Sequence, residues 1–176
     1  MPLSPDLQQL GADIVAAAYL TGDFILSSGK RSNYYFDKYL FETQPSILCR
    51  LGKALAALVP AETEKLACPE LGAVLLCGAV SMELDLPMVI LRKEAKGYST
   101  AKLIEGKLEP GQRVAVIEDV LTTGAAAIRA AQTIREAGAS VIKLIAVLDR
   151  EEGAAERLRA AKLECTPLFR KSDLKV

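Results

Sequence analysis

Apolar residues along this chain fall into two patterns, one with helical spacing and one of short unbroken runs. Leu7, Leu10, Ile14 and Val15 are spaced for one face of a helix behind a Ser-Pro-Asp start, which predicts a helix over residues 4–20. Further helices are predicted over 45–60, 72–84 and 123–137, and an amphipathic one after 154. The short, largely apolar runs predict strands at 66–68, 87–91, 114–117 and 141–148, with a terminal strand near the end of the chain.

These predicted strands are separated by helices and do not alternate apolar with polar residues. Strands of that kind are buried on both faces, in parallel sheets that helices cover from either side. We therefore expect an α/β fold, with one domain over 1–176 whose central, mostly parallel sheet carries helices on both faces. Residues 1–40 are expected to form a small N-terminal cap, in which 24–26 and 34–37 make a hairpin-like pair of short strands.

Composition narrows the possible chemistry. Lys plus Arg and Asp plus Glu number 22 each, so no overall field draws the protein to nucleic acid or to an anionic membrane, and any phosphate site must be local. The chain has no histidine, which excludes Ser-His-Asp and Cys-His nucleophiles, imidazole acid–base catalysis and His-ligated metals. Its four cysteines lack a C-x-x-C pair, and neither a leader-like N-terminus nor a long apolar run occurs, so we expect a soluble protein of the reducing cytoplasm.

The most informative segment joins the strand predicted at 114–117 to the helix after it. Glu118 and Asp119 follow the strand directly, and a Thr-Thr-Gly-Ala turn at 122–125 opens the helix. Both acids therefore lie at the carboxyl end of a strand, where open α/β sheets bind ligands, and the backbone N–H groups of 122–126 are free to bind a phosphate. Carboxylates repel phosphate but accept hydrogen bonds from sugar hydroxyls. Together these features indicate a phosphorylated ribose; the alternative is a solvated acidic turn before an ordinary helix.

A polar segment over 92–111 separates two of the predicted strands. Its first part, 92–106, carries four Lys or Arg residues and two glycines. Loops of this length in compact domains are commonly functional lids, and displacing pyrophosphate from a sugar needs cations on the leaving group and exclusion of water. The alternative is a solvated hairpin or surface loop.

The run VAVIEDVLTTGA resembles the donor-binding signature of the type I phosphoribosyltransferases. The segment that begins RKEAK and ends IEG is similar to the flexible catalytic loop of the orotate phosphoribosyltransferases, and the resemblance continues in matching order from Phe24 to Gly153. It implies the type I fold and a donor, 5-phosphoribosyl 1-diphosphate (PRPP), bound by Glu118, Asp119, Val120, Leu121, Thr122, Thr123, Gly124, Ala125 and Ala126. In the loop it implies Arg92, Lys93 and Lys96 as catalytic cations on the pyrophosphate, Lys96 foremost, with Tyr98 also at the donor.

The resemblance also implies partners. Because the family's loop reaches the site of the neighbouring subunit, a homodimer is implied. Magnesium is implied as an ion bound through the donor's pyrophosphate, with no ligand directly from the protein. Residues 68–73 stand where the family has its pyrophosphate-binding loop. The chain departs from the family pattern at Tyr98, where many relatives have a histidine, because tyrosine supplies no positive charge at neutral pH.

For the acceptor base, residues 24–37 resemble the part of the family in which aromatic side chains line the base pocket. Tyr35 and Phe36 are therefore expected to hold a flat pyrimidine, with Thr122 also at the base. Arg150 is implied to bind the orotate carboxylate, a planar anion that a guanidinium matches. The implied reaction joins orotate to the donor, giving orotidine 5′-monophosphate and pyrophosphate in pyrimidine synthesis.

Three alternatives stay open. Arg150 could instead form an ion pair with Asp149 or Glu151. The chain could use another base such as a purine, which would offer Arg150 no carboxylate to bind. It could also be a non-catalytic sensor that binds the donor to control transcription or an RNA element, although the sequence has no helix-turn-helix extension and no excess of basic residues.

Overall fold

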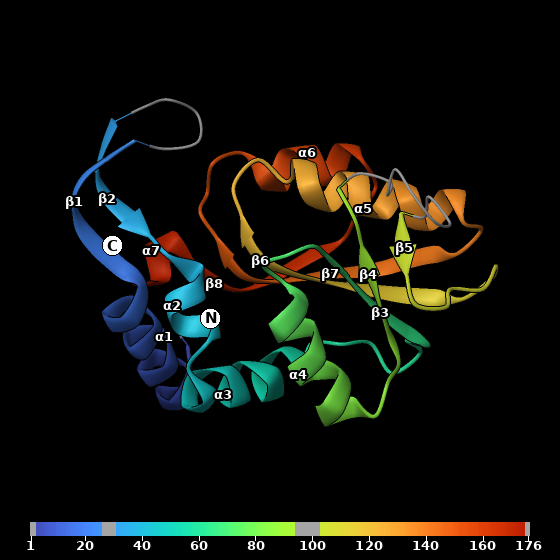
Figure 1. Cartoon of the computed structure of the whole chain (residues 1–176), viewed down its shortest axis with the longest axis horizontal. Coiled ribbons are helices and arrows are strands. Elements are labelled where there is room, and N and C mark those ends of the chain that lie inside the picture. The colour runs from blue at the N-terminus through green and yellow to red at the C-terminus, as the bar shows by residue number, and fades with distance from the viewer. Residues whose placement is uncertain (1–2, 26–30, 94–102, 175–176) are drawn as a thin grey trace.

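The computed structural model describes residues 3–25, 31–93 and 103–174 (Figure 1). A six-stranded sheet runs through the centre in the order β5-β4-β3-β6-β7-β8. Its strands are β3 (Lys65–Pro69), β4 (Met88–Leu91), β5 (Ile104–Glu105), β6 (Arg113–Leu121), β7 (Ser140–Asp149) and β8 (Cys165–Arg170). Neighbouring strands are parallel except β4 and β5, which are antiparallel. The predicted α/β class with a mostly parallel sheet is confirmed.

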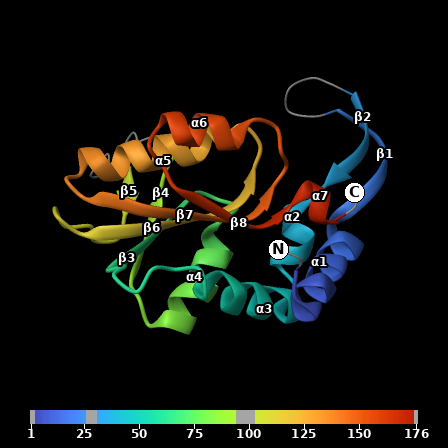
Figure 2. The same cartoon turned by 180° about the vertical axis from the view of Figure 1, so that it is seen from behind.

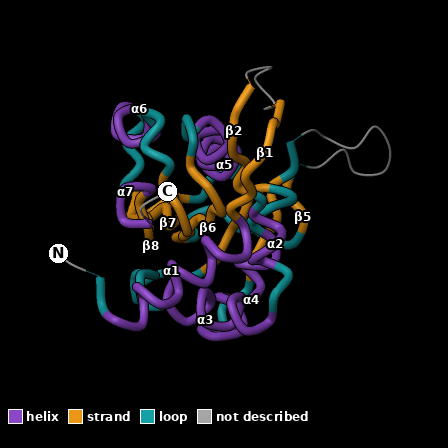
Figure 3. Tube along the Cα trace, turned by 90° about the vertical axis from the view of Figure 1, so that its left-hand side faces the viewer, coloured by secondary structure: helices purple, strands orange, loops and turns teal. Residues whose placement is uncertain are grey.

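Helices cover both faces of this sheet (Figures 1 and 3). One face carries α3 (Pro45–Ala56) and α4 (Val74–Leu84), and the other carries α5 (Ala125–Glu136) and α6 (Ala154–Ala160). Side chains alternate across β6, so Ala115 and Ile117 join the core that contains α3 and α4, whereas Val114 and Val116 join the core that contains α5. Because both faces are buried, the central strands are mostly apolar and do not alternate with polar residues. Across the three described ranges, no helix meets the length and hydropathy that a membrane span requires.

An N-terminal cap packs at one end of the sheet (Figure 2). It consists of α1 (Pro5–Ala18), the antiparallel hairpin of β1 (Tyr19–Ile25) and β2 (Arg31–Phe36), and α2 (Lys38–Glu42), with α7 (Lys171–Leu174) beside it. The Ser4 hydroxyl accepts a hydrogen bond from the backbone N–H of Leu7 (3.4 Å) and so caps α1. Leu10 and Ile14 of α1 enter the core that contains α3 and α4, so the cap and the sheet share one apolar interior.

The structure contains elements that the hydrophobic pattern did not predict. Helices α2 and α7 and strand β5 have five, four and two residues, too few for a period to be recognised. Strand β6 is longer than the predicted 114–117, because its pairing with β7 continues to Leu121. Glu118 and Asp119 are therefore strand residues, 6% and 3% exposed, and their interpretation as a solvated turn is wrong.

Candidate active site

A hollow of about 550 Å³ opens at the carboxyl end of β6. Its walls come from β2, α2, β6, the turn after β6, the start of α5 and the residues that follow β4 and β7. The lining residues are Tyr35, Phe36, Lys38, Lys93, Glu118, Asp119, Val120, Leu121, Thr122, Thr123, Gly124, Ala125, Ala126, Ala127, Arg129 and Arg150. Both the volume and the position, at the carboxyl ends of parallel strands, are those of small-ligand sites in open α/β sheets.

The turn between β6 and α5 forms one wall of this hollow. Gly124 caps α5 in the left-handed region (φ 72°), a conformation that glycine adopts without the strain a side chain would cause. No side chain in the described ranges caps this helix, so the N–H groups of its first turn face the hollow without an intrahelical partner. These N–H groups and the helix dipole favour an anion such as a phosphate at this place.

Two buried carboxyl groups lie next to the turn. Asp119 forms an ion pair with Lys38 of α2. Glu118 accepts a hydrogen bond at Oε1 from the backbone N–H of Asp119 (3.3 Å), and its Oε2 has no partner among the described residues. Burial, and after it the neighbouring negative charge of Asp119, raises the pKa of Glu118 well above its usual range. The pair can therefore both accept and donate hydrogen bonds, which suits the hydroxyl groups of a sugar.

Arg150 and two aromatic residues, Tyr35 and Phe36, also line the hollow. The Arg150 Nη2 atom lies 2.9 Å from Glu152 Oε1 and donates to the Tyr34 hydroxyl (3.4 Å). Glu152 is thus its ion-pair partner here, rather than the neighbouring acids considered from the sequence. Tyr35 is 42% exposed and packs against Phe24, while Phe36 lines the wall beside it. A guanidinium next to exposed aromatic surface can bind a flat, anionic ring.

The Tyr34 hydroxyl links Arg150 to the C-terminal end of the chain. It accepts a hydrogen bond from Lys171 Nζ (3.3 Å) as well as from Arg150. These cations, Lys171 first, lower the pKa of the Tyr34 hydroxyl, against the opposing effect of burial. Tyr34 also stacks on Tyr19 with ring centroids 5.4 Å apart. Arg150 is therefore held beside residues from both ends of the sequence.

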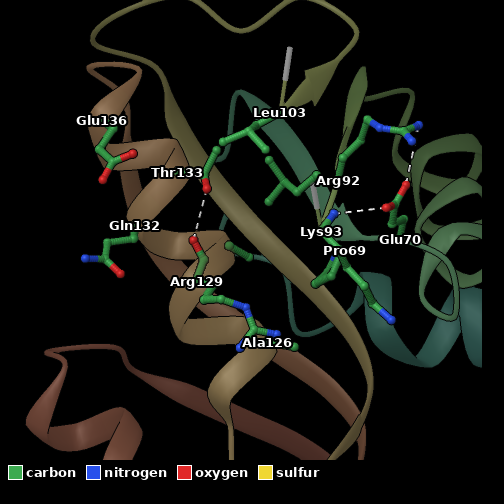
Figure 4. Close-up of a pocket in the computed structure, with 12 residues that line it drawn as sticks. Pro69, Glu70, Arg92, Lys93, Leu103, Ala126, Arg129, Gln132, Thr133 and Glu136 are labelled. Atoms are coloured by element: carbon green, nitrogen blue, oxygen red, sulfur yellow. Dashed lines mark hydrogen bonds and ion pairs between the residues drawn. The ribbon is translucent and has the colours of Figure 1, made fainter. Parts of the chain in front are cut away.

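A second hollow, of about 260 Å³, lies between the end of β4 and α5 (Figure 4). Arg92 and Lys93, which follow β4, both line it, and Lys93 also lines the larger hollow. Arg92 Nη1 lies 3.5 Å from Glu70 Oε2 and 3.8 Å from Glu105 Oε1. The Lys93 backbone N–H donates to Glu70 Oε1 (2.9 Å), and the Lys93 side chain reaches the larger hollow. Glu70, which follows β3, thus anchors the start of the polar segment from which Arg92 and Lys93 project.

Comparisons with known proteins identify the family. The phosphoribosyl transferase domain family matches residues 46–167. An orotate phosphoribosyltransferase of Methanocella arvoryzae is 46% identical over 153 residues, which cover 87% of each chain. The one from Natronomonas pharaonis is 47% identical over 159 residues, 90% of this chain and 91% of that one. The chain belongs to the orotate phosphoribosyltransferases. A solved orotate phosphoribosyltransferase of Mycobacterium tuberculosis, in complex with 5-phospho-alpha-D-ribosyl 1-diphosphate, shares the fold with a TM-score of 0.81 at 27% identity, covering 98% of this chain and 100% of that chain.

The family predicted from the donor motif and the loop is thereby confirmed. Of the site residues that the orotate phosphoribosyltransferase pattern implied, the structure brings Lys93, Glu118, Asp119, Val120, Leu121, Thr122, Thr123, Gly124, Ala125, Ala126, Tyr35, Phe36 and Arg150 to one hollow. Arg92 is not among its lining residues, because Glu70 and Glu105 hold its guanidinium elsewhere. Lys96 and Tyr98 lie outside the described residues. The roles of these residues in orotate phosphoribosyl transfer stay predictions.

Sequence reasoning missed several residues of the site. Tyr34 belongs to the segment 24–37 that was assigned to the base pocket, and Lys38 directly follows it, but nothing local indicates that Lys38 meets Asp119 or that Tyr34 meets Arg150. Glu70 lies in the segment recognised as the position of the family's pyrophosphate loop. Arg129 of α5, which lines both hollows, carried no signal beyond its place after the donor motif.

Proposed function

We propose that the chain catalyses the transfer of the 5-phosphoribosyl group from PRPP to orotate, forming orotidine 5′-monophosphate and pyrophosphate in pyrimidine synthesis. The observation that carries the proposal is the single hollow in which an anion-binding turn, a buried acid pair and Arg150 meet. These are the three features that a phosphate, a ribose and an anionic base require. The relative from Mycobacterium tuberculosis was solved with PRPP bound, which supports the donor.

The donor's 5-phosphate would bind at the turn that opens α5, and its ribose at the acid pair. Thr122, Thr123, Gly124, Ala125 and Ala126 offer backbone N–H groups and hydroxyls to the phosphate. Val120 and Leu121 connect the turn to the acids within β6, so the two subsites are rigidly spaced by strand geometry. Glu118 and Asp119 would accept hydrogen bonds from the ribose hydroxyls.

The leaving pyrophosphate needs positive charge as the bond to the anomeric carbon breaks. Lys93 reaches the hollow, and we assign Lys96, Arg92 and Tyr98 to the same end of the donor on the strength of the family pattern. Magnesium carried by the donor's pyrophosphate and hydroxyls would neutralise part of the leaving charge. The hollow fits a donor loaded in this way, because its lining contains both buried carboxyl groups, Glu118 and Asp119, and the cationic residue Lys93.

Orotate would lie between the donor and the far end of the hollow. Arg150 would bind the carboxylate, Tyr35 and Phe36 would contact the ring faces or edges, and Thr122 would contact the base from the turn. Arg150 decides between this base and a purine, because a neutral purine would leave the guanidinium without an anion.

The proposal is tested by incubating the purified protein with magnesium, PRPP and orotate and following the loss of orotate absorbance. Uracil, adenine and hypoxanthine serve as parallel acceptors. Consumption of orotate alone is the expected outcome. Turnover of a purine would move the assignment to another phosphoribosyltransferase, and donor binding without turnover of any base would favour a donor sensor.

Gly72 supplies a test of the donor site. A Cβ atom at this residue would lie 1.7 Å from Asp119 Oδ2 and 2.3 Å from Lys38 Nζ. Gly72→Ala must therefore displace the ion pair, and we expect the KM for PRPP to rise by about tenfold or more, with a smaller change in the KM for orotate. Steady-state kinetics with each substrate varied in turn measures this, and an unchanged KM for PRPP would contradict the placement of the ribose beside Asp119.

We also infer a homodimer whose contact surface includes one side of α4. This surface, called the α4 face, consists of Leu75 and Met82 of the helix and Leu71 in the turn before it; the three residues are 44%, 81% and 68% exposed. The three residues recur at helical spacing, and the helix is apolar on its opposite side as well, where Leu76 and Val80 are buried. A helix that is apolar all round is normally covered on all sides. Because Leu71 is adjacent to Glu70, the interface would adjoin the loop that reaches the neighbouring site.

Replacing both Leu75 and Met82 by Glu is expected to give a monomer, because burying two carboxylates at a subunit contact costs several kcal/mol. Turnover should fall with dissociation, since each site would lose the neighbour's loop. Analytical ultracentrifugation of the double variant measures the mass. Ile25→Glu, a charge at another exposed apolar residue (76% exposed), is the control and should leave the dimer intact. A dimeric double variant would place the contact elsewhere.

A cytoplasmic location is likewise proposed. Cys49, Cys68, Cys77 and Cys165 are all free thiols, and Cys68 and Cys77 are buried as small apolar side chains. Unpaired cysteines are typical of proteins in a reducing compartment.

A further inference from the structure

Glu42 is an ionisable residue buried without a hydrogen-bond partner among the described residues. It is the last residue of α2 and is 0% exposed. Neither Oε1 nor Oε2 has a hydrogen-bond partner within the described ranges. An unpaired carboxyl group in the interior is costly, and such groups in native proteins commonly serve a function rather than stability.

Lys38, one helical turn earlier on α2, is a possible ion-pair partner for the Glu42 carboxyl group. Side chains four residues apart on a helix are neighbours, so the Lys38 ammonium can reach Glu42 by a change of side-chain rotamer. In the structure, however, the ammonium is paired with Asp119, and the two lie directly against Gly72. Lys38 is thus bound to one carboxylate of the donor site while a second acceptor close by is unoccupied.

The ribose of PRPP and Lys38 would compete for Asp119. Under the proposed function the ribose hydroxyls donate to Asp119, whose Oδ2 already accepts from Lys38. The Lys38 ammonium cannot move toward Gly72, because it already lies so close to that residue that a Cβ atom there would overlap it. The displaced ammonium therefore needs another anionic partner in the same region.

We propose that Glu42 is a positioning residue for the donor site: when PRPP engages Asp119, the Lys38 ammonium moves from Asp119 to Glu42. The inference rests on the proposed function, because it requires PRPP as the ligand of Asp119. Lys38 would thereby block the ribose subsite until its ammonium moves, and the buried Glu42 carboxyl group, one helical turn from Lys38, would accept it. No covalent bond changes in this step.

The protonation of Glu42 gives the step a measurable signature. Burial, followed by the negative charge of Asp119, raises the pKa of Glu42 to about 8, with Lys38 opposing and Asp37 adding to the shift. On the helices packed against α2, Asp13 and Arg50 pair with each other. At pH 7 in the ligand-free protein, Glu42 is therefore mostly protonated. Arrival of the ammonium favours the carboxylate, so PRPP binding should release a proton from Glu42 below pH 8, and this release should fade above it.

The test is calorimetric titration of PRPP with magnesium, without orotate, into the wild-type protein and Glu42→Gln. Glutamine keeps the size of the side chain but cannot become an anion. We expect the Kd for PRPP to rise by about 10- to 100-fold in Glu42→Gln, because Lys38 stays on Asp119. Glu62→Gln, an exposed residue outside the site, is the matched control and should bind PRPP as the wild type does.

A second titration separates positioning from a packing effect. In the Lys38→Met background no ammonium has to move, so adding Glu42→Gln should change the Kd by less than about twofold. Titrations at pH 7 in two buffers of different ionisation enthalpy should show close to one fewer proton released by Glu42→Gln than by the wild type. Equal affinity and equal proton release in the wild type and Glu42→Gln would overturn the inference, as would an equal loss of affinity in the Lys38→Met background. Failure of the wild type to bind PRPP would instead overturn the proposed function.

Discussion

Asp119→Asn is expected to lower kcat/KM for PRPP by about 10²- to 10³-fold, because it removes a buried carboxylate that would hold the ribose. Asp119 is 3% exposed and carries the negative charge that fixes Lys38. Asparagine preserves the volume of the side chain but replaces one acceptor oxygen by an NH₂ donor, which faces the ammonium of Lys38 and the donor's hydroxyls alike. Charge-assisted hydrogen bonds of this kind are each worth about 1.5–3 kcal/mol.

The measurement is initial rate against PRPP concentration at saturating orotate, together with the Kd for PRPP in the absence of orotate. Both constants should weaken, whereas the KM for orotate should change little. Glu164→Gln is the control, since it removes one carboxylate from an ion pair with Lys143 of β7, neither of which lines the hollow, and should leave the kinetics unaltered. Wild-type kinetics in Asp119→Asn would show that the ribose does not bind at the acid pair.

Arg150→Ala is expected to raise the KM for orotate by about 100-fold while the Kd for PRPP stays within about threefold of the wild-type value. Arg150 is the cation beside the aromatic residues of the hollow. Its side chain is 21% exposed, so water would only partly screen its interaction with a carboxylate. Arg150→Lys should recover part of the loss, because an ammonium keeps the charge but not the two-pronged geometry.

Glu152→Gln supplies the matched control for Arg150. Glu152 Oε1 lies 2.9 Å from Arg150 Nη2 and would compete with orotate for the guanidinium. Its removal should leave the KM for orotate unchanged or slightly lower. Substrate-dependence assays with orotate distinguish the cases, and an Arg150→Ala variant with the wild-type KM for orotate would reopen the assignment to another base.

The donor motif shows how much of the site could be predicted locally. The strand, the acid pair and the turn from Val114 to Ala126 are contiguous, and the proposed phosphate site there consists largely of consecutive backbone N–H groups. Such a site depends on the local conformation of one strand–turn–helix unit, which the hydrophobic run and the Thr-Thr-Gly turn already specify. The family resemblance rested on the same run, and the comparisons confirmed the family.

The partners of these residues could not be predicted in the same way. Lys38 meets Asp119 across 81 positions of the sequence, and Arg150 meets Tyr34 across 116. The contact between Lys171 and Tyr34 spans 137. Each contact depends on the order of the strands and on how the cap packs at the end of the sheet, and neither follows from the period of apolar residues along the chain.

The sequence by itself determined the α/β class, the succession of most helices and strands, and the place of the donor turn, because hydrophobic period and turn chemistry act between near neighbours. Only the tertiary structure decided that Glu118 and Asp119 are buried strand residues, that Glu70 pairs with Arg92, that Lys38 pairs with Asp119, and that Glu42 is buried. Those facts arise from burial and charge contributed by distant segments, and desolvation and pairing exist only once the chain has brought those segments together.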